Sequence, residues 1–304
     1  MLREAENRVK IEGVLSEIDL KYGSFMKDGK PVETIGGVIK IQVDQQIGGV
    51  PATLEIPVHM FSTKYTKKSA ANPAYEAIEK VMNEYVSIPI AATSGVEPDK
   101  VRITSARIDM NEYFGQNGQL ISFPRITTSF VARATGTFKP EATFSAEFMV
   151  SNVAYVVDKE GVEVEPKKIE VTAILPRYGE RVDVIKLVAT NPNVIDAIEQ
   201  YWKANDTFKA NGRLNFTSQT HIETQEVDFG EPIERVVTTS LSELVITGGS
   251  QSPLEGDFAF DVNDIKKALA ERKDRLNALK AKGTKKKAPA PAASAGIDAN
   301  DLGF

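Results

Sequence analysis

The stretches NPAYEAIEKV at residues 72–81 and NPNVIDAIEQY at residues 191–201 decide the fold, because each predicts a short helix within a strand-rich chain. Each opens with Asn followed by Pro, a pair that caps a helix and then occupies its first turn. Apolar residues then recur three and four positions apart, as they do on one face of a helix. The shared NP and AIE elements indicate an internal repeat, with one more residue between them in the second copy.

Strand-like segments surround both helices, three before and two after each of them. Alternation of apolar and polar residues identifies the clearest of these segments, and Gly48-Gly49 predicts a hairpin turn between two of them. The expected strands of the first copy lie near Val9–Leu20, Val38–Val43, Leu54–Phe61, Val101–Met110 and Leu120–Arg133. Those of the second copy lie near Thr143–Val157, Lys168–Leu175, Val182–Thr190, Arg213–His221 and Ile233–Thr247.

Three strands, a helix and two strands is the order of the OB-fold, a five-stranded Greek-key barrel. The helix covers the open end of such a barrel with its apolar stripe. We therefore predict a mainly β chain of two tandem OB-like barrels, residues 1–140 and 141–250, each with one capping helix. Tyr201 and Trp202 at the end of the second helix are expected in the core. The alternative is a pair of generic β-sandwich domains that each carry one helix.

The sequence changes character after Ser250. Residues 251–283 predict a linker and an amphipathic helix that is capped by Asp261 and ended by Gly283. Residues 284–304 combine lysines, an Ala/Pro-rich run and an acidic tip, a composition that favours disorder. A partner protein can capture such a chain end together with its terminal carboxylate. The residues expected to bind partners are Asp298, Asp301, Leu302 and Phe304, and the alternative is a frayed end without a role.

Composition excludes several kinds of chemistry. The chain has no cysteine, so disulfides, thiolate metal sites and cysteine nucleophiles are absent. His59 and His221 fall one in each predicted barrel, without a pattern of further ligands near either. The glycine pairs match neither a phosphate-binding loop nor a dinucleotide fingerprint. We therefore predict no enzyme, no catalytic residue, no metal and no cofactor.

The charge distribution restricts the partners. The formal net charge is −5, and the first 250 residues hold 27 of the 37 basic and 34 of the 42 acidic residues. A nucleic-acid site on such a body must be a local basic groove. The sequence contains no run of about 18 apolar residues, so it gives no sign of a membrane partner. We expect a cytoplasmic location, in the host cytoplasm if the protein is phage-encoded.

Aromatic and basic residues gather in the expected loops and strand ends. Unpaired bases stack on aromatic rings, and Lys or Arg neutralises the phosphates between them. The residues expected to contact nucleic acid are Lys21, Tyr22, Phe25, Lys27, Lys30, Lys64, Tyr65, Lys67, Lys68, Arg102, Arg107, Tyr113, Phe114, Arg125, Arg177, Tyr178 and Arg181. The first five are expected in one loop, residues 21–30. The alternative is that the lysines are solvated surface and that rings such as Phe61 and Phe123 belong to the core.

Both ends of the chain carry a resemblance. The opening NRVKIEGVL at residues 7–15, the OB-type strand order and the ending DANDLGF at residues 298–304 together resemble single-stranded DNA-binding proteins. Bacterial members have a barrel, a low-complexity linker and an acidic tip that ends in Pro-Phe. This chain ends in Gly-Phe with two aspartates, which departs from that pattern. Two barrels in one chain look like a phage-type version.

The resemblance implies sequence-tolerant binding and protection of single-stranded DNA in replication, recombination or repair. It also implies that the C-terminal tip recruits replication or recombination proteins. An oligomerising β-rich structural protein of the virion type is the alternative function, and a metal-dependent nuclease is disfavoured by the lack of a clustered His/Asp motif. Oligomeric state, site size and the choice between DNA and RNA stay open.

Overall fold

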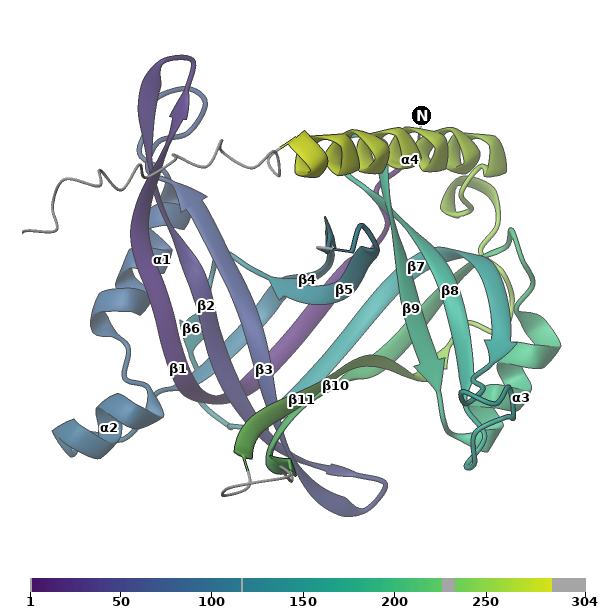
Figure 1. Ribbon diagram of the computed structural model, residues 1–304, viewed down its shortest axis with the longest axis horizontal. Coiled ribbons are helices and arrows are strands. Elements are labelled where there is room, and N and C mark those ends of the chain that lie inside the picture. Colours follow the sequence, from purple (N-terminus) through teal and green to yellow (C-terminus); the bar gives the residue numbers. More distant parts are fainter. Residues whose placement is uncertain (1, 116, 226–232, 286–304) are drawn as a thin grey trace, which may run out of the picture.

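The computed structural model describes residues 2–115, 117–225 and 233–285, which contain eleven strands and four α-helices (Figure 1). The strands are β1 (Asn7–Lys27), β2 (Lys30–Ile47), β3 (Val50–Thr63), β4 (Lys100–Phe114), β5 (Leu120–Thr127), β6 (Ala132–Arg133), β7 (Glu141–Tyr155), β8 (Ile169–Arg177), β9 (Arg181–Ala189), β10 (Thr207–Gln225) and β11 (Ile233–Gly249). The helices are α1 (Pro73–Glu84), α2 (Ile88–Ser94), α3 (Pro192–Tyr201) and α4 (Val262–Lys285), with a 3-10 turn at Gly256–Phe258. The prediction of a mainly β chain is confirmed.

The pairings of the first five strands return to their starting point. β1 pairs antiparallel with both β2 and β4, and β2 pairs antiparallel with β3. β5 then pairs parallel with β3 and antiparallel with β4. The hydrogen-bonded path therefore leads from β1 through β2, β3, β5 and β4 back to β1, and we call these strands the first ring.

The strands from β7 to β11 repeat this pattern. β7 pairs with β8, β8 with β9, β9 in parallel with β11, β11 with β10, and β10 with β7. We call these strands the second ring. β1 also pairs antiparallel with β7, so both rings belong to one large sheet.

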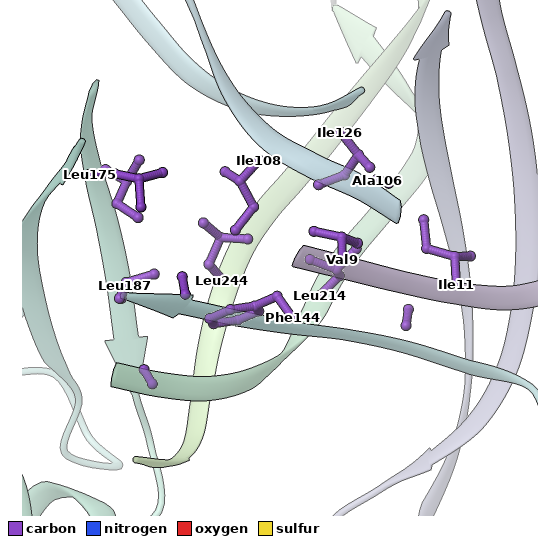
Figure 2. Close-up of a cluster of buried hydrophobic side chains, with 14 of the residues drawn as sticks. Val9, Ile11, Ala106, Ile108, Ile126, Phe144, Leu175, Leu187, Leu214 and Leu244 are labelled. Carbon is purple, nitrogen blue, oxygen red and sulfur yellow. The ribbon is translucent and has the colours of Figure 1, made fainter. Parts of the chain in front are cut away.

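One hydrophobic core runs through both rings. Figure 2 shows Val9, Ile108 and Ile126 of the first ring beside Phe144 and Leu187 of the second. Complete burial of such a side chain stabilises the fold by roughly 1.5–3 kcal/mol. The alternating apolar residues that identified the strands are the ones that point into this core.

Helices α1 and α3 form where the repeat predicts them. The Asn72 side chain accepts a hydrogen bond from the Ala74 backbone N–H at 3.2 Å, and Asn191 caps α3 in the same way. Ile78 of α1 is completely buried, as expected of the helix stripe. Each helix lies between the third and fourth strands of its ring in the chain order.

The end of α3 separates two residues that were both expected in the core. Trp202 is buried and stacks on Phe208 with 5.1 Å between ring centroids, and its indole N–H donates to the Ser250 carbonyl. Tyr201 remains exposed, so its prediction is wrong. The reason is that α3 ends at Tyr201, and the chain leaves the helical path at Trp202 and turns that ring inward.

Residues 21–30 form a hairpin and not the expected loop. β1 continues to Lys27, β2 begins at Lys30, and Asp28 and Gly29 make the turn with positive φ angles. We call residues 21–33 the arm; its strands project beyond the ring in Figure 1. The turn at Gly48-Gly49 is confirmed, whereas the strand expected up to Arg133 breaks after Thr127.

Two further helices complete the fold. Helix α2 was not predicted, although Ser87 followed by Pro89 is a start signal of the same kind. Asp261 caps α4, accepting a hydrogen bond from the Asp264 N–H at 2.9 Å. Helix α4 contacts β9 of the second ring and β4 of the first, and it ends at Lys285, two residues beyond the predicted end (Figure 1).

Candidate nucleic-acid interface

The outer face of β3, β5 and β4 displays a row of polar side chains. His59 on β3 pairs with Thr127 on β5, and Thr127 pairs with Arg107 on β4. In the next row, Arg125 on β5 pairs with Asp109 on β4. Successive residues of a strand point to opposite faces, and the residues between these positions are buried in the core. The row therefore faces outward.

Two neighbouring hollows extend from this face and share Arg107, Asp109 and Arg125. One hollow measures about 780 Å³ and is also lined by His59, Phe61 and Phe130. The other measures about 400 Å³ and reaches the second ring; its further lining includes Glu4, Glu112, Arg177, Tyr178, Arg181, Asp183, Arg275 and Leu279. The two hollows adjoin at these three residues, and we call them together the arginine groove.

All four carboxylates in the second of these hollows bind a cation. Glu4 pairs with Arg107 at 2.6 Å, and Glu112 pairs with Arg272. Asp109 and Asp183 both pair with Arg177. The negative charge of the groove is therefore engaged in ion pairs.

Three arginines of the groove have no carboxylate partner among the described residues: Arg125, Arg181 and Arg275. The Nε atom of Arg125 is also buried without a hydrogen-bond acceptor. A buried donor without a partner costs free energy. Burial is the main cause that lowers the pKa of His59, and the positive charge of Arg125 lowers it further.

Exposed aromatic rings lie along the groove. Phe61 is 61% exposed, Phe130 is 52% exposed and Tyr178 is 83% exposed. Gly36 lies opposite Phe61 on β2, where a Cβ would approach the Phe61 ring to 3.0 Å. The glycine thus leaves space for the Phe61 ring against the strand. Exposed rings of this kind are available for stacking.

Arg177 fixes the two halves of the groove relative to one another. It lies at the end of β8 in the second ring, and its guanidinium donates to the Ile108 carbonyl of the first ring at 2.7 Å. It also binds Asp109 of the first ring and Asp183 of the second. Burial raises the pKa of Asp183, and the charge of Arg177 opposes this rise. Arg177, which the sequence predicted as a DNA contact, therefore connects the two rings.

The arm brings two of the predicted groups together. Phe25 and Lys27 of the arm line a hollow of about 360 Å³ with Tyr65 and Lys67 from the loop after β3. Tyr22 donates a hydrogen bond to Glu79 of α1 at 2.9 Å. Lys21, Lys30 and Lys68 are exposed nearby in the chain, outside the lining of this hollow, and Lys64 forms an ion pair with Glu33 at 2.8 Å.

Other predicted residues lie outside the arginine groove and outside the hollow beside the arm. Arg102 forms a bidentate ion pair with the buried Glu12 at 2.8 Å, so its guanidinium is engaged. The hydrogen bond from Arg102 is the main cause that lowers the pKa of Glu12. Tyr113 packs edge-on against Phe123, and Phe114 lies beneath Lys280 of α4. The tip residues Asp298, Asp301, Leu302 and Phe304 lie outside the described residues.

Sequence reasoning missed several residues of the groove. Phe61 was weighed as core and Phe130 was not considered, although both are exposed there. Arg275 was missed because it belongs to the C-terminal helix, which was expected to follow the binding domains. Only the excess of basic over acidic residues in that helix could have suggested Arg275.

No curated protein matches the sequence. A deletion mutant of the single-stranded DNA binding protein from Thermus aquaticus aligns with a TM-score of 0.49 and 11% identity, covering 83% of this chain and 97% of its own. A replication protein A heterotrimer bound to ssDNA gives 0.22 and 10%, covering 78% and 49%. Both TM-scores lie below 0.5.

The described helices and side chains add two observations. None of the described helices is long and apolar enough to cross a membrane. Within residues 2–115, 117–225 and 233–285, no three His, Asp or Glu side chains are arranged to hold a metal ion. A family model described as YorF matches residues 5–282, and the chain therefore belongs to the YorF family.

Proposed function

We propose that the two rings are OB-type barrels and that the chain is divided into residues 1–140, 141–250, 251–283 and 284–304. The strand order supports this, because the third strand of each ring pairs in parallel with the fifth and a helix separates the third from the fourth. OB-folds bind oligonucleotides on the face of the second and third strands and with the adjoining loops. The arginine groove begins over this face of the first ring.

The function that the groove supports best is sequence-tolerant binding of single-stranded DNA. One observation carries this proposal: the groove's carboxylates are paired, while Arg125, Arg181 and Arg275 have no partner among the described residues. A backbone phosphate satisfies such a guanidinium with a charge-assisted, bidentate hydrogen bond. The overall negative charge does not prevent this, because the attraction is local.

The exposed rings explain why an unpaired strand is preferred. Phe61, Phe130 and Tyr178 present flat surfaces on which bases stack. In a duplex the base faces are covered by their neighbours, so the rings gain nothing from it. Stacking is indifferent to the identity of the base, and sequence-tolerant binding follows.

The arm hollow is the second part of the proposed binding surface. Phe25 and Tyr65 are exposed, and Lys27 and Lys67 have no ion-pair partner among the described residues. Phe61 of the groove and Thr63 of the arm hollow are two residues apart on β3, so they lie on the same face of that strand. A DNA strand that leaves the arginine groove along β3 therefore reaches the arm hollow.

The role in the cell is proposed in the same terms. The protein would protect single-stranded DNA in replication, recombination or repair, as a phage-type member without enzymatic activity or cofactor, in the host cytoplasm. The C-terminal tip would recruit replication or recombination proteins. Removal of the residues after 290 is expected to leave DNA affinity equal or higher, since an acidic tip competes with DNA for the cations. A fall in oligo-dT affinity after truncation would contradict this role.

Titration with oligo-dT tests the proposed function. The exposed Tyr65 and Tyr178 are the reporters, because Trp202 is buried. We expect quenching of tyrosine fluorescence by oligo-dT at low salt, with little response to a duplex of equal length. Equal affinity for duplex and single strand, or no quenching together with no mobility shift, would remove the proposal. Large assemblies by light scattering in the absence of DNA would then favour a structural protein.

A further inference from the structure

Helix α4 supplies one wall of the arginine groove. Arg275 and Leu279 both line it, and they are four residues apart, so they lie on one face of the helix. The other two unpaired arginines come from elsewhere: Arg125 from β5 of the first ring and Arg181 from β9 of the second. The three cations thus meet at a junction of three separate parts of the chain.

The N-terminal half of α4 is fixed to the body by apolar contacts. Ile265 and Ala268 are buried within the hydrophobic core cluster. Phe260, just before the helix, is also buried, and the Arg3 guanidinium lies 4.2 Å from its ring centroid. The helix is therefore a packed element and not a detached appendage.

An ion pair with little solvent exposure fixes the second half. Arg272 binds Glu112 of β4, and their side chains are only 14% and 9% exposed. The Ser122 hydroxyl donates a second hydrogen bond to Glu112 at 3.3 Å. Residues 272 and 275 are neighbours on the helix surface. Arg272 neutralises Glu112, one of the carboxylates that line the groove, and Arg275 has no carboxylate partner among the described residues.

We propose that α4 is a nucleic-acid-binding element, and that Arg275 binds a backbone phosphate of the strand in the groove while Leu279 packs against the same strand. This inference rests on the proposed function. It assigns a binding role to a helix outside both proposed barrels. It also means that the strand is held between α4 and the two rings, so that it is contacted from opposite sides.

Helix α4 offers its own matched control. Lys273 is exposed and lies two positions from Arg275, hence on another face of the same helix. Arg275→Ala and Lys273→Ala each remove one positive charge from α4. Bulk electrostatics affects both variants alike, whereas a phosphate contact affects only Arg275→Ala.

The experiment compares the full-length wild type, Arg275→Ala, Lys273→Ala and Arg275→Lys in oligo-dT binding over a series of salt concentrations. Log affinity falls as log salt rises, and the loss of one phosphate contact makes this negative slope shallower by about 0.7. We expect this change in Arg275→Ala, none in Lys273→Ala, and recovery of the slope in Arg275→Lys. Equal slopes in the two alanine variants, whether changed or unchanged, would overturn the inference.

A parallel measurement separates this inference from the proposed function. Arg125→Ala lies in the first ring and far from α4 in sequence. If Arg125→Ala weakens binding while Arg275→Ala matches Lys273→Ala, the groove binds DNA without the helix. If no variant changes the slope, or if the wild type does not bind oligo-dT, the proposed function itself fails and the inference fails with it.

Discussion

Arg177 of the second ring binds Asp109 of the first, and the same guanidinium also binds Asp183. This contact places the outer face of β4 next to the turn that carries Tyr178. Arg177 is only 18% exposed, so the three charges interact away from most of the solvent. The arginine groove crosses from one ring to the other at this point.

Arg177→Ala is expected to destabilise the protein by about 3–5 kcal/mol, because it leaves two mostly buried carboxylates without a cation. Urea unfolding at pH 7, followed by the fluorescence of the buried Trp202, measures the loss. The control is Arg8→Ala, since Arg8 is exposed and forms no ion pair with any described residue. The control should stay within about 0.5 kcal/mol of the wild type.

The pH dependence of Arg177→Ala provides a second check. Burial already raises the pKa of Asp183 above its usual 3.8, and loss of Arg177 removes the opposing charge. A carboxyl group with a raised folded pKa binds more protons when folded, so stability falls as the pH rises through that range. The gap between variant and wild type should therefore narrow from pH 7 to pH 5. A constant gap would contradict the assignment.

The ion pair between Glu12 and Arg102 predicts the opposite dependence of stability on pH. The hydrogen bond from Arg102 keeps the pKa of Glu12 below its usual 4.5. This stabilisation is present above pH 4.5 and is lost as the pH falls through the lower, folded pKa. Glu12→Gln should lower the Tm by about 5 °C at pH 7 and by less at pH 3. A Tm difference of the same size at both pH values would refute this explanation.

The aromatic rings predict a loss of affinity without a loss of charge. Phe61→Ala and Tyr178→Ala should each weaken oligo-dT binding roughly 5- to 140-fold, since stacking contributes about 1–3 kcal/mol per base. Their salt slopes should match that of the wild type. Phe258→Ala is the control, because the exposure of Phe258 lies between those of Phe61 and Tyr178 but the residue does not line the groove. A loss of equal size in the control would exclude specific stacking.

The arm predicts an effect that depends on DNA length. In the wild type, affinity should rise again once an oligo-dT is long enough to extend from the groove to the arm. Tyr65→Ala should remove this second rise and leave the shortest oligomers unaffected. Tyr201→Ala, at an exposed tyrosine on α3, is the matched control. If Tyr65→Ala binds every length as the wild type does, the arm takes no part in binding.

The elements could be predicted from the sequence because their signals are local. Asn-Pro starts both repeat helices, and alternating side chains identify the strands that enclose the core. The arm could not be predicted in this way. Both faces of residues 21–30 are exposed, so no alternation distinguishes this hairpin from a loop.

Which charged residues form ion pairs with one another could not be predicted, because the partners are distant in the sequence. Arg102 finds Glu12 at a distance of 90 residues along the chain, and Arg272 finds Glu112 at a distance of 160. The sequence predicted lysine and arginine alike as the residues that bind phosphates. Only the pairing separates Arg102, which stabilises the fold, from Arg125 and Arg181, which are free to bind an anion.

The salt dependence of oligo-dT affinity in the double variant Arg125→Ala/Arg181→Ala, beside Arg102→Ala and Arg8→Ala, tests the central claim most directly. Two lost phosphate contacts should make the negative slope of log affinity against log salt shallower by about 1.4, and the two single variants should keep the wild-type slope. An unchanged slope in the double variant, or an equally shallower slope in Arg8→Ala, would contradict the claim that unpaired arginines bind the DNA strand.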